Sequence, residues 1–377
     1  MTPPMSPPLA VGVPRERKHG EHRVAITPDG VHELVVHDVP VIVEHDAGAG
    51  SSISDDDFRA AGAEIVTDAD DVWARADLVL KVKEPQPEEL DRLRPGLVLF
   101  TYLHLAAYPH VADALLAQRV TGIAYETVQI ASGALPLLAP MSEVAGRMAP
   151  QVGSHFLERE HGGRGVLLGG APGVRPARVV VLGAGNVGWN AAWIAQGMEA
   201  EVLLLDKNLD RLRWVDQIHK GRIMTLASNR LAVERAVADA DLVIGAVLVP
   251  GGRAPVVVTD AMVRSMRAGS VIVDCAIDQG GCVEHVHETS HAEPVYEVAG
   301  VLHYAVGNIP AAVPHTSTYA LTNATLPYVV ALATRGVHAA TTSDPELALG
   351  VNTVDGQVVN PAVADALGRA CAPFPDL

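Results

Sequence analysis

Residues 179–197 read VVVLGAGNVGWNAAWIAQG, and this stretch places a glycine-rich turn between an aliphatic run and an alanine-rich run. Within the turn, Gly183, Gly185 and Gly188 have the spacing G-x-G-x-x-G. In a strand–turn–helix unit the first glycine allows the tight turn, the second lets a pyrophosphate approach the backbone, and the third lets helix and strand pack closely. The free N–H groups at the start of the helix would face the phosphates. The stretch therefore predicts a dinucleotide-binding turn.

An acidic residue follows at the distance that such a turn requires. The run EVLLLD has the character of a second strand and ends in Asp206, 18 residues after Gly188. A carboxylate at this place can accept a hydrogen bond from a ribose 2′-hydroxyl and would repel a 2′-phosphate, which favours NAD over NADP. The adjacent Lys207 leaves the strictness of that choice open. A glycine turn without a ligand is the alternative, and the strand–helix–strand context argues against it.

Strand-like and helix-like runs alternate through both halves of the chain. In the first half, the expected strands are 10–14, 39–45, 76–82 and 96–103, and the expected helices are 28–37, 55–62 and 111–120. In the second half, the expected strands are RVVVLGAG, EVLLLD, DLVIGAV and SVIVDCA. Such alternation implies parallel sheets covered by helices on both faces. We therefore predict an α/β protein with two doubly wound, Rossmann-like domains.

Length and composition limit the possible partners. The 377 residues suffice for two domains. A formal net charge of -16 argues against nucleic acid or an anionic membrane as the main partner, because both need basic patches. Three cysteines without a Cys-x-x-Cys pattern favour a reduced, cytoplasmic protein. The proline-rich residues 1–9 lack signal-peptide features, and we expect them to be a disordered extension. The sequence contains no run of about 18 apolar residues, so we expect no transmembrane helix.

Eight further segments, taken together, resemble the alanine dehydrogenase family. They are GEHRVAITP, LVLKVKEP, LFTYLHLA, YETVQ, ALPLLAPMSEVAGR, DLVIGAVLVPG, AIDQGG and TSTYALTNATLPY, and they occur in order between residues 10 and 340. The family shares its fold with the NAD-binding domain of proton-translocating transhydrogenase and, more distantly, with lysine-forming saccharopine dehydrogenase. The resemblance implies NAD-dependent, reversible oxidative deamination of L-alanine to pyruvate and ammonium. It also implies a homohexamer.

The resemblance assigns roles to four side chains. Arg23 would bind the substrate carboxylate, since a guanidinium grips it with two parallel bonds, and Lys83 would also bind substrate. His104 would pass protons, and Asp278 would stabilise positive charge and position water or ammonia. Without the motifs, other interpretations of these residues remain. Arg23 would form a surface ion pair and Lys83 would be solvated. His104 would be one of 16 histidines without a special role, and Asp278 would simply end a strand. Asp278 belongs to the other domain, so we expect the active site in the cleft between the two domains.

The same resemblance predicts further cofactor contacts and the domain boundaries. The expected cofactor-binding residues outside the glycine turn are Met141, Ser142, Ser228, Val247, Leu248 and Asn308, of which Ser228 has the weakest local motif. Residues 10–140 and 309–377 would form a discontinuous substrate domain, and 141–308 the NAD-binding domain. Helices near 142–160 and 317–333 would connect them. Pro150 is expected to kink or break the first, because a proline inside a helix removes a hydrogen bond.

No metal site is predicted. Some members of the family carry a histidine near the position of Arg335 that is proposed to form a metal pair with a glutamate in the YETVQ motif. Because arginine is not a metal ligand, Glu126 is not expected to bind an ion. We interpret Glu284, His287 and His291 as a polar loop.

Two other functions remain as alternatives. One is a saccharopine-type amino-acid dehydrogenase, against which the RVAITP and AIDQGG segments argue. The other is a non-catalytic NAD-binding module like that of the transhydrogenase. The arginine, lysine, histidine and aspartate at the catalytic motif positions argue against this second alternative.

Overall fold

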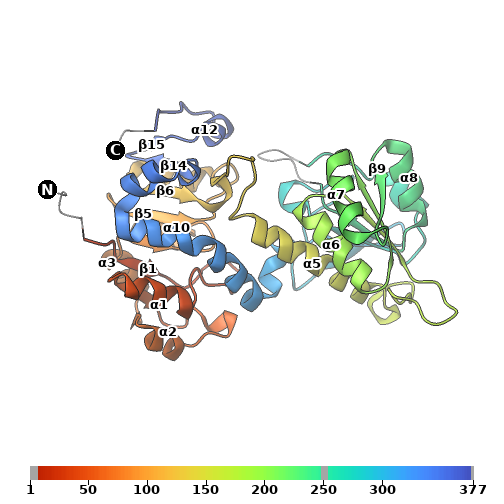
Figure 1. Cartoon of the computed structure of the whole chain (residues 1–377), viewed down its shortest axis with the longest axis horizontal. Coiled ribbons are helices and arrows are strands. Elements are labelled where there is room, and N and C mark those ends of the chain that lie inside the picture. Colours follow the sequence, from red (N-terminus) through yellow and green to blue (C-terminus); the bar gives the residue numbers. More distant parts are fainter. Residues whose placement is uncertain (1–6, 248–253, 375–377) are drawn as a thin grey trace. The chain divides into compact units, whose positions relative to one another are not determined.

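The computed structural model describes residues 7–247 and 254–374, and two compact units divide the chain. We call Met1–Met141 with Val313–Leu377 the N/C unit, and Ser142–Ala312 the middle unit. Each unit contains its own sheet, built mainly from parallel strands and accompanied by helices (Figure 1). The prediction of an α/β protein with two Rossmann-like domains is therefore confirmed.

The sheet of the N/C unit joins the two ends of the chain. Its strand order is β15-β14-β6-β5-β4-β1-β2-β3. The strands are β1 (Val11–Val13), β2 (Val41–Glu44), β3 (Glu64–Val66), β4 (Leu78–Leu80), β5 (Val98–Thr101), β6 (Thr121–Ala124), β14 (Val351–Val354) and β15 (Gln357–Val358). The first six strands pair in parallel, whereas β14 and β15 add antiparallel pairs at one edge. The C-terminal segment thus completes a sheet that the N-terminus begins.

Several helices of the N/C unit begin after residues whose side chains accept hydrogen bonds from free backbone N–H groups. Thr27 caps α1 by accepting from the Gly30 backbone N–H, and Pro28 occupies the first turn, where no donor is needed. The helices are α1 (Pro28–Val36), α2 (Asp55–Ala61), α3 (Ala69–Arg75), α4 (Pro109–Ala117), α10 (Pro314–Ser343), α11 (Pro345–Ala348) and α12 (Pro361–Leu367). Short 3₁₀ turns are η1 (Ala49–Ser51), η2 (Pro87–Arg92) and η3 (Tyr125–Thr127). Turn η2 follows the loop after β4 that contains Lys83, and η3 directly follows β6.

The middle unit has the strand order β12-β13-β11-β10-β7-β8-β9. Its strands are β7 (Arg178–Leu182), β8 (Glu201–Asp206), β9 (Met224–Ala227), β10 (Leu242–Gly245), β11 (Val271–Asp274), β12 (Val295–Val298) and β13 (Val301–Tyr304). Its helices are α6 (Asn186–Gly197), α7 (Leu209–His219), α8 (Arg230–Asp239) and α9 (Asp260–Ser265), with 3₁₀ turns η4 (Arg159–His161), η5 (Ile277–Gln279) and η6 (Ile309–Ala312). Only β12 runs antiparallel among these strands. The order reverses beside β7, the switch point at which such sheets bind ligands.

Of the two outcomes expected at Pro150, a kink or a break, the break is wrong. Helix α5 (Ala139–Phe156) runs through this proline as one helix. Close packing on both sides supports it: a Cβ on Gly146 would lie 2.3 Å from the Val187 carbonyl oxygen, and a Cβ on Gly153 would lie 2.6 Å from the Leu242 side chain. Tertiary contacts therefore override the local cost of the proline.

The second helix expected from the sequence is longer than predicted. Helix α10 extends from Pro314 to Ser343 and bends at Gly336, whose φ of 74° and ψ of 166° are not helical. None of the helices in the described part of the chain combines the length and apolar character that a membrane crossing requires.

Candidate active site

The glycine turn of the middle unit has the geometry of a phosphate cradle. Gly183 has a φ of 105°, and a Cβ there would lie 2.6 Å from the Ala246 carbonyl oxygen. A Cβ on Gly188 would lie 1.7 Å from the carbonyl oxygen of Gly183. Gly185 is the N-cap of α6 and provides no side-chain cap for the first backbone N–H groups of that helix. Space and donors are therefore present where a pyrophosphate would approach.

Asp206 lies directly beside this turn. Its Oδ2 accepts from the Ala184 backbone N–H at 2.6 Å, and its Oδ1 accepts from the Asn208 N–H at 2.7 Å. Arg211 approaches the same carboxylate, with 3.8 Å between Nη1 and Oδ2, and sequence reasoning did not find this residue. Its position in the first turn of α7, the helix that follows Asp206, is the sequence feature that could have identified it. A guanidinium at this place can contact a phosphate, and it also neighbours the Asp206 carboxylate, the proposed acceptor for the ribose hydroxyl.

Two other predicted cofactor residues, Ser228 and Val247, lie just after strands of the middle unit. The backbone N–H of Ser228, just after β9, donates to the Asp206 carbonyl oxygen at 2.9 Å. Val247 follows β10, and Leu248 lies outside the described residues. Ser142 belongs to α5. The structure thus brings Ser228 to Asp206 by a direct hydrogen bond.

Asp278 and Asn308 meet in the same unit. Asp278 sits in η5, after β11, and its Oδ1 accepts from the backbone N–H of Asn308 at 3.3 Å. Asn308 has a left-handed φ of 57°. The nearby Asp274 is buried and accepts from the backbone N–H groups of Ala276, Cys282 and Val283, which identifies it as a structural residue.

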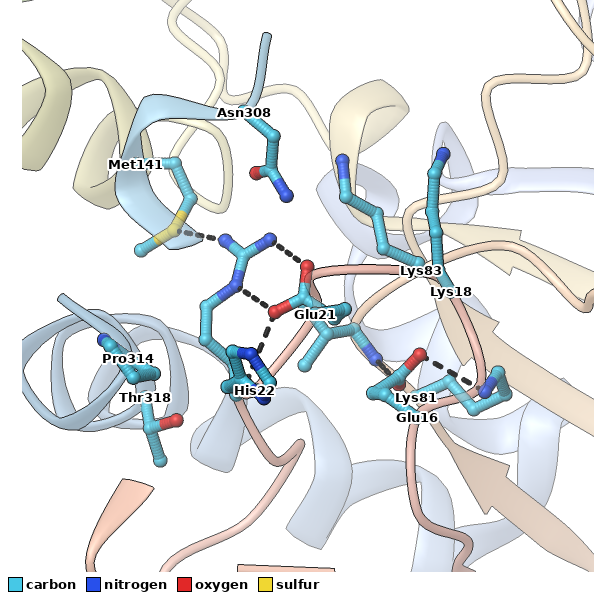
Figure 2. Close-up of polar contacts among 12 residues, drawn as sticks. Glu16, Lys18, Glu21, His22, Lys81, Lys83, Met141, Asn308, Pro314 and Thr318 are labelled. Carbon is cyan, nitrogen blue, oxygen red and sulfur yellow. Dashed lines mark hydrogen bonds and ion pairs between the residues drawn. The ribbon is translucent and has the colours of Figure 1, made fainter. Parts of the chain in front are cut away.

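Arg23 of the N/C unit is buried and tied to its neighbour Glu21 (Figure 2). Its Nε donates to Glu21 Oε1 at 2.7 Å and its Nη2 to Oε2 at 2.5 Å. Burial alone would raise the pKa of Glu21, but the charge and hydrogen bonds of Arg23, with a contribution from Lys83, lower it to about 2. Nη1 contacts Met141 Sδ at 2.9 Å. The guanidinium is therefore held rigidly and stays charged.

Lys81 and Lys83 have different environments, although they are two residues apart. Strand β4 ends at Leu80, so the alternation that would turn both lysines to one face no longer applies. Lys81 is fully buried between Glu16 at 3.1 Å and Glu89 at 3.0 Å, whereas Lys83 is half-buried (Figure 2). Lys81 is thus a structural cation under the loop that presents Lys83.

His104 occupies a strained position after β5. Its φ of 46° is left-handed, and its backbone N–H donates to Glu126 Oε1 at 2.6 Å. The same oxygen lies 3.7 Å from His104 Nδ1. Glu126 belongs to η3, which follows β6, the parallel neighbour of β5. Sequence reasoning considered Glu126 only as a metal ligand; the signal for its contact with His104 was that both residues follow the carboxyl ends of neighbouring strands.

Tyr102 supports the histidine ring. The two rings are parallel within 4° with their centroids 5.7 Å apart. The Tyr102 hydroxyl donates to the Leu137 carbonyl oxygen at 2.6 Å. His104 is 36% exposed at its side chain, so its imidazole is supported on one side and accessible to a proton partner.

Two side-chain groups in the described residues have the composition of metal ligands. They are His45 with Asp46 and Asp55, and His155 with Glu158 and His161. Neither group includes Glu126 or any predicted catalytic residue. His287, which we interpreted as part of a polar loop, stacks on Tyr296 with the ring centroids 3.8 Å apart.

Comparison with known proteins gives consistent matches over the whole chain. Family models for the N-terminal and C-terminal domains of alanine dehydrogenase/PNT match residues 12–145 and 149–361. An alanine dehydrogenase from Mycolicibacterium smegmatis is 57% identical over 368 residues, which are 98% of both chains. A solved L-alanine dehydrogenase has a TM-score of 0.93 and 50% identity, covering 96% of this chain and 99% of its own. A transhydrogenase from Sinorhizobium meliloti has a TM-score of 0.81 and 26% identity, covering 94% and 99%.

Proposed function

The chain belongs to the alanine dehydrogenase/PNT family, and we propose that it catalyses the reversible, NAD-dependent oxidative deamination of L-alanine to pyruvate and ammonium. Family membership confirms the resemblance inferred from the eight sequence segments. The observation that carries the proposal is the presence, in one chain, of the glycine cradle beside Asp206 and of a buried arginine beside Lys83. The first suits a dinucleotide and the second a small carboxylate.

The middle unit is the proposed NAD-binding domain. Gly183, Gly185 and Gly188 leave the space that the pyrophosphate needs, and Asp206 offers a ribose acceptor. Ser142, Ser228, Val247, Leu248 and Asn308 are proposed further contacts. Bound NAD supplies the hydride acceptor, and the protein supplies binding, orientation and proton transfer. We place the domain at residues 141–308, with 10–140 and 309–377 as the substrate domain.

The substrate residues act by charge. Arg23 and Lys83 bind the carboxylate and, in pyruvate, the carbonyl oxygen, and so fix the reacting Cα. His104 takes a proton from the water that adds at the oxidised Cα and gives one to the departing ammonia. Asp278 stabilises the positive charge on the nitrogen-bearing centre. Arg23 and Asp278 belong to different units.

Neither alternative function is favoured. A binding-only module like the transhydrogenase domain would need neither His104 nor the support that Glu126 and Tyr102 give it. The identity to the transhydrogenase is 26%, compared with 50% to the solved L-alanine dehydrogenase. For a saccharopine-type enzyme, the RVAITP and AIDQGG segments remain the argument against.

Three finer features are part of the proposal. We infer a homohexamer from the family resemblance and a cytoplasmic location from the three free cysteines. The partners are small molecules: L-alanine or pyruvate, and ammonium. No metal ion is required, because Glu126 is engaged with the backbone of His104 and Arg335 offers no ligand.

The test is the near-ultraviolet absorbance of NADH with purified protein, NAD and L-alanine at alkaline pH. D-Alanine, L-lysine and NADP are the controls. We expect NADH to form only with L-alanine and NAD. Absence of NADH formation, in protein that demonstrably binds NADH, would reject this substrate.

A further inference from the structure

One edge of the Arg23 guanidinium is occupied by its neighbour. Glu21 accepts from Nε at 2.7 Å and from Nη2 at 2.5 Å, and it also accepts from the Arg23 backbone N–H at 3.1 Å. The two side chains are 0% and 1% exposed. Three hydrogen bonds between residues two apart lock the pair, since neither side chain can rotate without breaking at least two of them.

This pairing decides which edge of the arginine faces a ligand. A guanidinium is planar, and it grips a carboxylate through two neighbouring N–H groups. With Nε and Nη2 engaged by Glu21, a second carboxylate gripped in this way must use the Nη1–Nη2 edge. Nη1 contacts Met141 Sδ, a weak acceptor that a carboxylate would replace at little cost (Figure 2). Glu21 therefore orients the arginine for its ligand.

Glu21 also sets the charge around the ligand. Lys83 lies close enough for its charge to lower the pKa of Glu21, so Arg23, Lys83 and Glu21 act together. Their formal charges leave one net positive charge. The buried network of Lys81, Glu16 and Glu89 lies near enough for the charge of Glu16 to act on Arg23, but burial raises the pKa of Glu16, the direction that brings this network toward neutrality.

One net positive charge matches one carboxylate. A ligand with two carboxylates would bring a second negative charge into a desolvated place where Glu21 is already an anion. An unmatched buried charge costs far more than an unmatched surface charge.

We propose that Glu21 is a positioning and specificity-determining residue. It orients Arg23 so that the Nη1–Nη2 edge takes the substrate carboxylate, and its charge restricts the site to 2-oxo and 2-amino acids with a single carboxylate. This inference rests on the proposed function.

The experiment compares pyruvate with oxaloacetate in reductive amination by the full chain. Wild-type turnover of pyruvate tests the proposed function alone. Glu21→Gln should raise the KM for pyruvate roughly tenfold with a smaller change in kcat, because orientation of Arg23 is lost. It should also raise the ratio of kcat/KM for oxaloacetate to that for pyruvate by roughly tenfold, because one negative charge is removed. Glu21→Asp keeps the charge, so it should raise KM but leave the ratio unchanged.

Glu44→Gln is the matched control. Glu44 is buried in the same unit, pairs with Arg17 at 2.5 Å and accepts from the Arg15 backbone N–H at 2.8 Å, so it is a carboxylate–arginine pair elsewhere. In Glu44→Gln the ratio of kcat/KM for oxaloacetate to that for pyruvate should stay at the wild-type value. An unchanged ratio in Glu21→Gln, or an equal rise in Glu44→Gln, overturns the role in specificity.

Two measurements decide the matter if Glu21→Gln does not fold. A wild-type KM for pyruvate in Glu21→Asp overturns the positioning role. Competitive inhibition of the wild-type enzyme should be at least roughly tenfold stronger with propionate than with malonate, since only malonate brings the second charge. Equal inhibition overturns the charge restriction.

Discussion

The two units bind their proposed ligands by different means. The middle unit relies on backbone: a glycine turn, the first N–H groups of α6 and a carboxylate that accepts from main-chain donors. The N/C unit relies on buried side-chain charges, with Arg23 held by Glu21 and Lys81 held by Glu16 and Glu89. A site built from backbone depends on glycines, which have no side chain, within one short segment. A site built from charged side chains depends on partners that the fold brings together. The following predictions test this difference.

The largest effect should come from the N/C unit. His104→Ala should lower kcat about 10²- to 10⁴-fold, because a proton-transfer group is lost, while NADH binding stays unchanged. Single-turnover kinetics and NADH fluorescence titration measure the two quantities. His110→Ala, in the adjacent helix α4, is the control and should keep wild-type turnover. Full activity of His104→Ala would reject the mechanism while leaving the family assignment intact.

In the middle unit, a single methyl group should strongly weaken the backbone site. Gly188→Ala would place a Cβ 1.7 Å from the Gly183 carbonyl oxygen, so the turn must open. We expect NADH affinity to fall by about 10²-fold, since the helix start no longer faces the phosphates. Gly197→Ala is the matched control, because no atom lies within 4 Å of a Cβ there. Titration of both variants should separate the turn from α6 as a whole.

The units should also differ in their response to acid. Burial, with a smaller effect of His287, lowers the pKa of His303 to about 4 from an ordinary value of 6.5. The unfolded state therefore binds more protons between these values, and stability is full above the ordinary pKa and falls as the pH decreases. Between pH 7 and 5 the loss should be about 2 kcal/mol of unfolding free energy. Urea unfolding of the wild type and of His303→Phe measures it, and an equal pH dependence in both would contradict the assignment.

The smallest effect concerns the support of His104. Glu126→Gln keeps a carbonyl oxygen for the His104 backbone N–H but loses the negative charge 3.7 Å from Nδ1. We expect about a tenfold lower kcat/KM, because the proton-transfer group loses its anionic neighbour. NADH fluorescence titration and thermal unfolding distinguish this effect from a structural defect, which would also lower the NADH affinity or the Tm. Tyr102→Phe keeps the ring stack and should keep the wild-type kcat/KM.

Much of the architecture could be predicted from local patterns. Buried aliphatic strands such as β7, β8 and β11 were expected, whereas β3 and β9 were missed, because their few, partly exposed residues form neither a clear period nor an apolar run. Helix α5 differs in the other direction, because a local preference was overestimated. Pro150 was expected to kink or break the helix, but packing at Gly146 and Gly153 holds it together. Local rules fail where tertiary contacts supply more free energy than the local preference.

The sequence by itself determined the glycine turn and Asp206, because their function depends on spacing within a single strand–helix–strand unit. Together with the family motifs it also pointed to Arg23, Lys83, His104 and Asp278. Only the tertiary structure decided that Glu21 holds Arg23, that Lys81 is fully buried between two carboxylates while Lys83 is half-buried, and that Glu126 meets His104. The physical reason is that a charged side chain acquires its role from the partners and burial that the fold provides, and those are not encoded in local spacing.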